Sequence, residues 1–331
     1  MKKIKVAQIG TSVNSHGNQV FNSLLKQSDI FEVVGYAFPE NERQKFPKQA
    51  CRFDGYREMT VAEILNDPEI EAVAVETEEI YLTKYAQMVA DAGKHLHMEK
   101  PGGIGYADFE RLIATLREKK LVFSIGYMYR FNPKIKEAID KVKSGVLGKI
   151  FSVEAHMSCK HPIMLREWLG NFPGGMMYFL GCHLVDLIYT IQGTPDEVIP
   201  LNFSSGIDGV GSDDCGMAIF KYKNGLSFAK TSANECGGFL RRQLVVTGEF
   251  GTIELKPLEA YDEGGIYTVM GECYGDGWLD STVLSRSVPY DRYDGMMYNF
   301  AELIRGKENP YSYEYELELY RLVLKASGVT I

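Results

Sequence analysis

The sequence lacks the features that mark a protein for a membrane, a nucleic acid or an oxidising compartment. It has no apolar run near the ~20 residues that a membrane-spanning helix needs, and the apolar stretch after "MKK" is too short for the core of a secretory signal. Its 36 basic residues are outnumbered by 44 acidic ones, giving a net charge of −8, whereas a nucleic-acid partner requires a basic face. We therefore expect a cytoplasmic protein that binds neither nucleic acid nor membrane.

Cysteine is also scarce, with six residues among 331 and no C-x-x-C pair. In a chain of this size such scattered cysteines indicate reduced thiols rather than a disulfide framework. Cys159 and Cys182 have His156, His161 and His183 as sequence neighbours. Their spacing matches no familiar zinc pattern, so we expect no metal.

The chain does contain two contrasting patterns of secondary structure. Residues 1–126 alternate short β-rich runs, beginning at residues 4–9, with helical patterns, which predicts a parallel sheet with crossover helices. Residues 127–331 are richer in hairpin signals, including two runs joined across Asn224-Gly225. We expect an α/β protein with an N-terminal Rossmann domain (1–126) and an α+β domain (127–331). The second domain should have a mostly antiparallel open sheet, with C-terminal helices that pack back on the first domain.

The stretch "IGTSVNSHGNQ" has the outline of a dinucleotide-binding βα turn. Gly10 occupies the first glycine position of G-x-G-x-x-G, but Ser12 and Ser15 replace the other two glycines. The loop is either an altered cofactor loop or an ordinary βα connection. If it is a cofactor loop, the amides of Thr11, Ser12 and Val13 should face a shared concavity at the N-terminus of the next helix.

The ribose-binding acid of such a fold is expected at the end of the second strand. That position holds Phe38, and Glu40 is the nearest substitute. Arg43 and Lys45 are candidates to accept the 2′-phosphate of NADP instead, or the segment is simply a solvated charged loop. The choice between NAD and NADP stays open.

Two further stretches contain candidate acid–base groups. In "GKHLHMEKPGG", Glu99 and Lys100 leave the carboxyl end of a predicted strand. There a lysine can protonate a carbonyl oxygen or hold a substrate hydroxyl, unless it is a surface lysine before a turn proline. In "PGGMMYFLGCHLVD", His183 shares one helical face with Phe179 and Asp186. It is either an acid–base group beside a carboxylate or a core histidine satisfied by the backbone.

Together these pieces resemble the glucose–fructose oxidoreductase/inositol dehydrogenase family (Gfo/Idh/MocA). The resemblance spans essentially the whole chain and rests on "VAQIGT", "AGKHLHMEKPGG", "GYMYRFNP", "GGMMYFLGCHLVDLI" and the closing helical tail. It implies an NAD- or NADP-dependent oxidoreductase of sugars, inositols or related polyols, with Lys100 and His183 as catalytic residues. It also implies cofactor contacts from Gly10, Thr11, Ser12, Val13, Phe38, Glu76, Thr77, Glu99 and Lys100.

The same resemblance implies where the substrate binds. Lys100 and His183 should converge in one pocket between the domains, with Asp186 orienting the histidine ring. The remaining pocket residues would be Tyr127, Arg130, Arg166, Trp168, Phe179 and Asp186. A tryptophan suits stacking on a sugar face, although core packing explains a single tryptophan equally well.

The chain departs from the family pattern at several of these positions. Phe179 stands where the family often has an aspartate, and Leu82 stands where a histidine is expected. Thr77 is kept, but Glu76 and Glu78 flank it, and their negative charge disfavours a nearby pyrophosphate unless they point away. These departures favour an alternative, a regulatory protein that senses a dinucleotide or sugar without turnover. On either hypothesis we expect a homodimer or homotetramer, because an antiparallel sheet covered on one face leaves the other face to be buried.

Overall fold

The computed structural model describes residues 2–275, 277 and 281–331. The chain forms two compact units. The first comprises Met1–Met128 and Arg292–Tyr320, and the second comprises Tyr129–Asp291 and Arg321–Ile331. In the described part of the chain, no helix has both the length and the apolar character needed to cross a bilayer.

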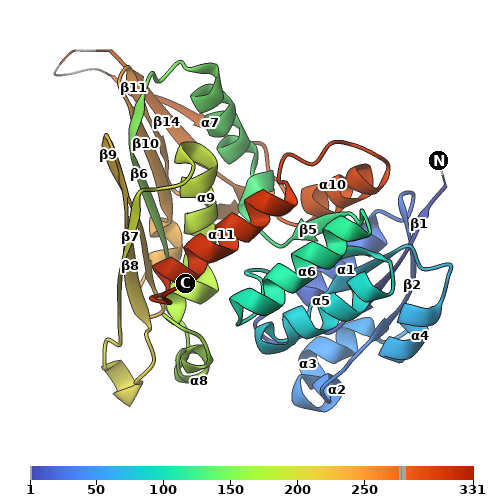
Figure 1. The fold of residues 1–331 in the computed structure, drawn as a ribbon. Helices are drawn as coiled ribbons and strands as arrows, with labels where there is room; N and C mark the ends of the chain where they lie inside the picture. Colours follow the sequence, from blue (N-terminus) through green and yellow to red (C-terminus); the bar gives the residue numbers. More distant parts are fainter. Residues whose placement is uncertain (1, 276, 278–280) are drawn as a thin grey trace. The chain divides into compact units, whose positions relative to one another are not determined.

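The first unit contains a five-stranded, all-parallel sheet in the order β2-β1-β3-β4-β5 (Figure 1). Its strands are β1 (Ile4–Ile9), β2 (Phe31–Ala37), β3 (Ala72–Val75), β4 (His95–Met98) and β5 (Phe123–Ile125). The central strand β3 reads "AVAV" and is buried along its whole length, as expected for a strand covered on both faces. The strand order reverses between β1 and β3, and open α/β sheets bind ligands at the carboxyl ends of the strands at this point.

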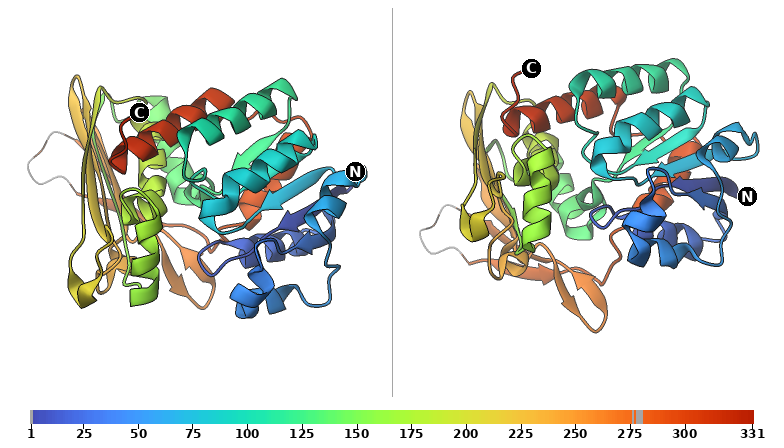
Figure 2. Two further views of the ribbon diagram at one scale, coloured as in Figure 1. Left: turned by 60° about the horizontal axis from the view of Figure 1, so that its bottom comes forward. Right: turned by 90° about the horizontal axis from the view of Figure 1, so that it is seen from below.

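Helices cover both faces of this sheet. They are α1 (Gly17–Lys26), α2 (Glu42–Lys45), α3 (Pro47–Ala50), α4 (Val61–Asn66), α5 (Leu82–Asp91), α6 (Tyr106–Glu118) and α10 (Asp294–Ile304). Helices α5 and α6 pack together on one face, and α1 packs with α10 on the other (Figure 2). The buried side chains of α5 recur at helical spacing, at Leu82, Ala86 and Val89, which explains why this segment folds as an amphipathic helix.

The second unit is built on an eight-stranded sheet in the order β15-β14-β11-β10-β6-β9-β8-β7. Its strands are β6 (Ile150–Ser158), β7 (Glu197–Phe203), β8 (Cys215–Tyr222), β9 (Gly225–Ser232), β10 (Gln243–Gly248), β11 (Gly251–Leu255), β14 (Val269–Tyr274) and β15 (Val283–Arg286), and a separate hairpin pairs β12 (Ala260–Asp262) with β13 (Gly265–Tyr267). Every pair in the large sheet is antiparallel except β6 with β9. The predicted hairpin is present, but its two-residue turn is Lys223-Asn224 rather than Asn224-Gly225, because Gly225 pairs with Tyr222 in the sheet.

Helices α7 (Pro133–Ser144) and α9 (Cys182–Gln192) pack on one face of the large sheet. The unit also contains α8 (Ile163–Trp168) and the last residues of α11 (Tyr313–Ala326). Helix α7 begins after Asn132, whose Oδ1 caps it by accepting hydrogen bonds from the amides of Lys134 (2.9 Å) and Ile135 (3.2 Å). The single helix predicted around His183 is instead divided into a π-helical turn, Met177–Gly181, followed by α9.

The opposite face of the large sheet carries apolar side chains on its strands. Leu201, Phe203 and Leu226 are 48, 56 and 54% exposed, and Figure 1 shows α7 and α9 on the other side of these strands. The predicted fold class, a Rossmann-like parallel sheet followed by a mostly antiparallel open sheet, is confirmed.

Candidate active site

Gly10 follows β1, where the strand order of the first unit's sheet reverses. It has a φ of +92°, a conformation that favours glycine. A Cβ on this residue would lie 2.4 Å from Thr77 Cγ2 and 2.6 Å from Thr77 Cα. The ends of β1 and β3 therefore approach each other closely, and only glycine permits this approach.

The two serines of the loop satisfy the loop's own amides. Ser12 Oγ accepts hydrogen bonds from the amides of Asn14 (3.1 Å) and Ser15 (2.8 Å), while Ser15 Oγ accepts one from the Ser12 amide (3.0 Å). The loop thus keeps a tight conformation without its second and third glycines. Of the three amides expected to face an anion, that of Ser12 already has an acceptor within the protein.

The Thr11 amide also has an acceptor, and it is one that the sequence reasoning missed. The Thr11 amide donates a hydrogen bond to Glu42 Oε2 at 3.1 Å. Glu42 lies at the start of α2 and has no solvent exposure. Burial raises the pKa of Glu42 to about 9, so this carboxyl is largely protonated at neutral pH. The signal available in the sequence was weak, because Glu42 lies in a charged stretch that resembles a solvated loop.

The residues expected near a ribose have other partners. Phe38 packs on Tyr36 and Phe53, with ring centroids 4.7 and 5.0 Å away. Arg43 donates to Tyr36 Oη at 2.7 Å and to Glu58 Oε2 at 2.8 Å. Phe38 is therefore part of an aromatic cluster, and the Arg43 guanidinium is held beside it.

The other two charged candidates are also engaged in contacts. Glu40 Oε1 accepts hydrogen bonds from Lys84 (2.6 Å) and from the Tyr85 hydroxyl (2.7 Å). Lys45 Nζ lies 3.3 Å from Glu78 Oε2. A 2′-phosphate would have to compete with Glu78 for the Lys45 ammonium.

Buried ionisable groups gather at the carboxyl ends of β3 and β4. Glu76 and His97 are both fully buried, with Glu76 Oε1 3.6 Å from His97 Nε2. Burial, and next the neighbouring Glu99 carboxylate, raise the pKa of Glu76 well above its usual range. Burial lowers the pKa of His97 to about 4 and raises that of Glu79 to about 8. The sequence led us to expect negative charge from Glu76, whereas its environment favours the neutral acid.

Lys100 and Glu99 follow β4 beside this cluster. Lys100 has no solvent exposure, and its Nζ lies 3.8 Å from Glu99 Oε1, which also accepts a hydrogen bond from the Lys100 amide at 2.9 Å. Glu99 Oε2 lies 2.7 Å from His16 Nδ1 and accepts a hydrogen bond from the His16 amide at 3.2 Å. Glu99 thereby connects His16, in the loop after β1, to Lys100. The sequence did not point to His16 as a partner of Glu99.

In the second unit, His183 is buried on α9 next to aromatic side chains. Its ring centroid lies 5.5 Å from that of Tyr129 in an edge-to-face arrangement. Phe179, in the preceding π-helical turn, lies 5.3 Å from Trp168 and 6.3 Å from His161, centroid to centroid. The structure thus brings Phe179 and Trp168 together.

Asp186 is paired with an arginine. Arg130 Nη2 donates to Asp186 Oδ1 at 2.8 Å, and Arg130 Nε lies 3.1 Å from both carboxylate oxygens. Both side chains are almost fully buried. This bidentate pair holds the Asp186 carboxylate at Arg130, and a role for Asp186 in orienting His183 stays a prediction.

Other arginines of the second unit belong to buried networks. Arg166, expected to bind substrate, pairs with Asp208 and lies 3.3 Å from Asp214. Arg242, which the sequence reasoning missed, lies 3.1 Å from Glu259 Oε2. The sixth expected substrate residue, Tyr127, is buried in the first unit.

In the described part of the chain, no three His, Cys, Asp or Glu side chains are arranged to hold a metal ion.

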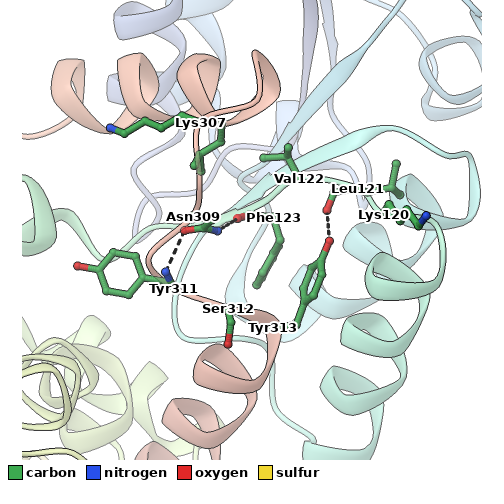
Figure 3. A pocket seen from close by; sticks show the side chains of 10 residues that line it. Lys120, Leu121, Val122, Phe123, Lys307, Asn309, Tyr311, Ser312 and Tyr313 are labelled. Carbon is green, nitrogen blue, oxygen red and sulfur yellow. Dashed lines mark hydrogen bonds between the residues drawn. The ribbon is translucent and has the colours of Figure 1, made fainter.

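A pocket in the first unit lies away from these residues. It is formed by residues 120–123 with segments around Leu303 and 307–313, and it contains the hydrogen bond from Asn309 Nδ2 to the Phe123 carbonyl at 3.3 Å (Figure 3). These residues surround the amino end of β5. Ligands of open α/β sheets bind at the carboxyl ends, so we do not assign the active site to this pocket.

Comparisons with known proteins agree with this organisation. Residues 4–127 match the oxidoreductase family's NAD-binding Rossmann fold, and residues 135–254 match the GFO/IDH/MocA C-terminal domain. The chain belongs to the GFO/IDH/MocA family. The expected nicotinamide dinucleotide cofactor is confirmed at the level of the domain, since the first unit carries the family's NAD-binding fold.

Individual relatives are distant. The chain is 34% identical to the uncharacterized oxidoreductase YhhX of Escherichia coli over 137 residues, 41% of this chain and 39% of that one. It is 23% identical to myo-inositol 2-dehydrogenase of Thermotoga maritima over 250 residues, 73% of this chain and 67% of that one. The matches span only 39, 61 and 65% of the length of YhhX and two further curated relatives. A levoglucosan dehydrogenase solved with NADH and levoglucosan has the same fold (TM-score 0.78, 16% identity, 99% and 98% of the two chains).

Proposed function

We propose that the protein is an NAD- or NADP-dependent oxidoreductase that transfers a hydride to or from a carbon bearing a hydroxyl group in a sugar, inositol or related polyol. The observation that carries this proposal is Lys100. Its side chain is fully buried after the carboxyl end of β4, with the Glu99 carboxylate beside its ammonium group. A buried lysine held by a carboxylate is suited to moving a proton at a substrate oxygen.

The first unit fits a dinucleotide. Gly10 allows the close approach of β1 and β3 at the point where such cofactors bind, and a pyrophosphate would lie against the loop from Gly10 to Val13, where the Thr11 and Ser12 amides donate to Glu42 and Ser15 in this structure. When bound, the nicotinamide supplies the hydride acceptor or donor. The protonated Glu42 and Glu76 carboxyls lower the negative charge that this anionic ligand meets.

The substrate class follows from relatives whose names specify polyols, a myo-inositol 2-dehydrogenase and a levoglucosan dehydrogenase. We assign the hydroxyl proton to Lys100 and a second acid–base role to His183. Arg130 and Trp168 suit a sugar, because guanidinium groups donate to hydroxyls and an indole stacks on a sugar face.

The test is turnover with a panel of inositols, anhydrosugars and aldoses, using NAD and NADP separately. Lys100→Ala and His183→Ala should each lower kcat/KM by about 10² to 10⁴ while leaving circular dichroism unchanged, as expected for loss of a positioned acid–base group. Near-normal turnover would remove the altered residue from the mechanism. Tight NADH binding without turnover of any polyol would instead support a regulatory protein.

A further inference from the structure

We propose that Lys100 exchanges its proton with solvent through Glu99 and His16, three side chains that form a proton relay across the first unit. This inference rests on the proposed function, in which Lys100 accepts or donates a substrate proton at each turnover. His16 acts through the other two groups and is therefore a positioning residue rather than a catalytic one.

The relay follows from consecutive contacts. Lys100 Nζ lies 3.8 Å from Glu99 Oε1, and the other oxygen of the same carboxylate, Oε2, lies 2.7 Å from His16 Nδ1. The first distance is that of an ion pair, and catalytic hydrogen bonds that are long in a ligand-free protein commonly shorten when the substrate is bound. The second distance is that of a strong hydrogen bond.

Burial gives the relay its direction. The side chains of Lys100 and Glu99 are 0 and 2% exposed, whereas that of His16 is 23% exposed. The Lys100 side chain therefore has no direct contact with water in this structure, whereas the His16 side chain has one. An imidazole can take a proton on one ring nitrogen and release it from the other, which suits a group at the exit.

Two further acids that interact with Lys100, Glu76 and Glu79, are not exposed to solvent. Glu76 contacts His97, which is also fully buried. The Glu99 carboxyl accepts hydrogen bonds from two backbone amides, and its oxygens also face the His16 ring and the Lys100 side chain. Glu99 thus links the buried lysine to the partly exposed histidine.

One proton passes along the relay for each substrate oxidised. The hydroxyl O–H bond breaks as an N–H bond forms on the neutral Lys100 amine, and the hydride leaves with its electron pair to the dinucleotide. The Lys100 proton moves to Glu99 Oε1 as the proton shared by Glu99 Oε2 and His16 Nδ1 moves onto the imidazole, and the imidazolium then releases a proton from its other ring nitrogen, Nε2, to water. Reduction runs the same steps in reverse.

The first test measures turnover at low buffer concentration. His16→Gly should lower kcat by about 10²-fold, in the range of a lost proton-transfer group, and should raise the solvent deuterium isotope effect on kcat. Added imidazole should restore kcat to His16→Gly but not to Lys100→Ala. His95→Gln, which removes a histidine from the other end of β4, is the matched control and should behave as the parent protein. Undiminished kcat in His16→Gly, or a loss that imidazole does not restore, would overturn the relay.

The second test needs no substrate and so separates the relay from the proposed function. Hydrogen exchange of the Lys100 ammonium is measured by NMR in ¹⁵N-lysine-labelled, full-length protein, with Lys100→Arg used to assign the signal. Exchange should slow in His16→Gln and recover with imidazole, even if every polyol fails as a substrate. Equal exchange rates in the parent protein and His16→Gln would overturn the relay whatever the turnover assays show.

Discussion

Glu42 is a carboxyl that the fold holds in its acid form. It has no exposed surface, and its pKa rises from 4.5 to about 9 because of burial. Between these values the folded protein binds one proton more than the unfolded chain. The free energy of unfolding therefore falls as the pH rises through this window, by at most about 1.4 kcal/mol per pH unit for one group.

Glu42→Gln should remove this part of the pH dependence. Glutamine keeps an oxygen to accept the Thr11 amide and carries no charge to bury. We expect the variant to be more stable than the parent protein at pH 8 and nearly equal to it at pH 5, as measured by urea unfolding at both pH values. Glu110→Gln, at an exposed position of α6, is the control. A parallel shift of Glu42→Gln at both pH values would show that Glu42 is ionised in the folded protein.

Residues recognisable by local motif could be predicted, and those defined by distant contacts could not. Gly10 and Lys100 stand in recognisable stretches of sequence, and the structure places both at the carboxyl ends of central strands. Glu42 and His16 carry no such mark. They gain their roles from partners 31 and 83 residues away in the chain, Thr11 and Glu99, which only the folded sheet brings close.

At the scale of elements, the loop after β1 is held by its serine hydroxyls. Ser12→Ala would leave the buried Ser15 amide and the Asn14 amide without their acceptor. We expect a loss of about 1–3 kcal/mol in the free energy of unfolding, the usual cost of an unsatisfied buried polar group. Val13→Ala, in the same loop but 61% exposed, should change stability by less than about 0.5 kcal/mol. Equal stabilities of the two variants in urea unfolding would contradict this account.

In the segment before His183, the spacing of apolar residues does not predict the helix type. Its apolar residues predict one continuous α-helix, but residues Met177–Gly181 form a π-helical turn. A π turn inserts an extra residue into the helical repeat and so changes the angle between Phe179 and His183. Tertiary packing decides this register, and hydrophobic spacing alone carries no signal for it.

At the scale of the molecule, the open face of the large sheet predicts self-association. Phe203 and Leu201 lie on it in the edge strand β7 with about half of their surface exposed. We expect light scattering to give at least twice the chain mass of 37.2 kDa. Phe203→Glu should shift the protein towards the monomer, because a carboxylate is costly to bury in an apolar interface. Glu197→Gln, at an exposed position of the same strand, should not. A monomeric parent protein would refute this prediction.

The chain passes between the two units at 128/129, 291/292 and 320/321, so neither unit is one uninterrupted segment. Within the first unit, Tyr320 packs on Phe109 with a centroid separation of 4.6 Å and donates a hydrogen bond to the Gly103 carbonyl at 2.7 Å. A ribosome must therefore synthesise the chain through Tyr320 before the amino-terminal unit obtains these buried side chains. Until then Phe109 lacks the Tyr320 ring that packs on it, and the nascent amino-terminal segment is a natural substrate for chaperones that bind exposed apolar surface.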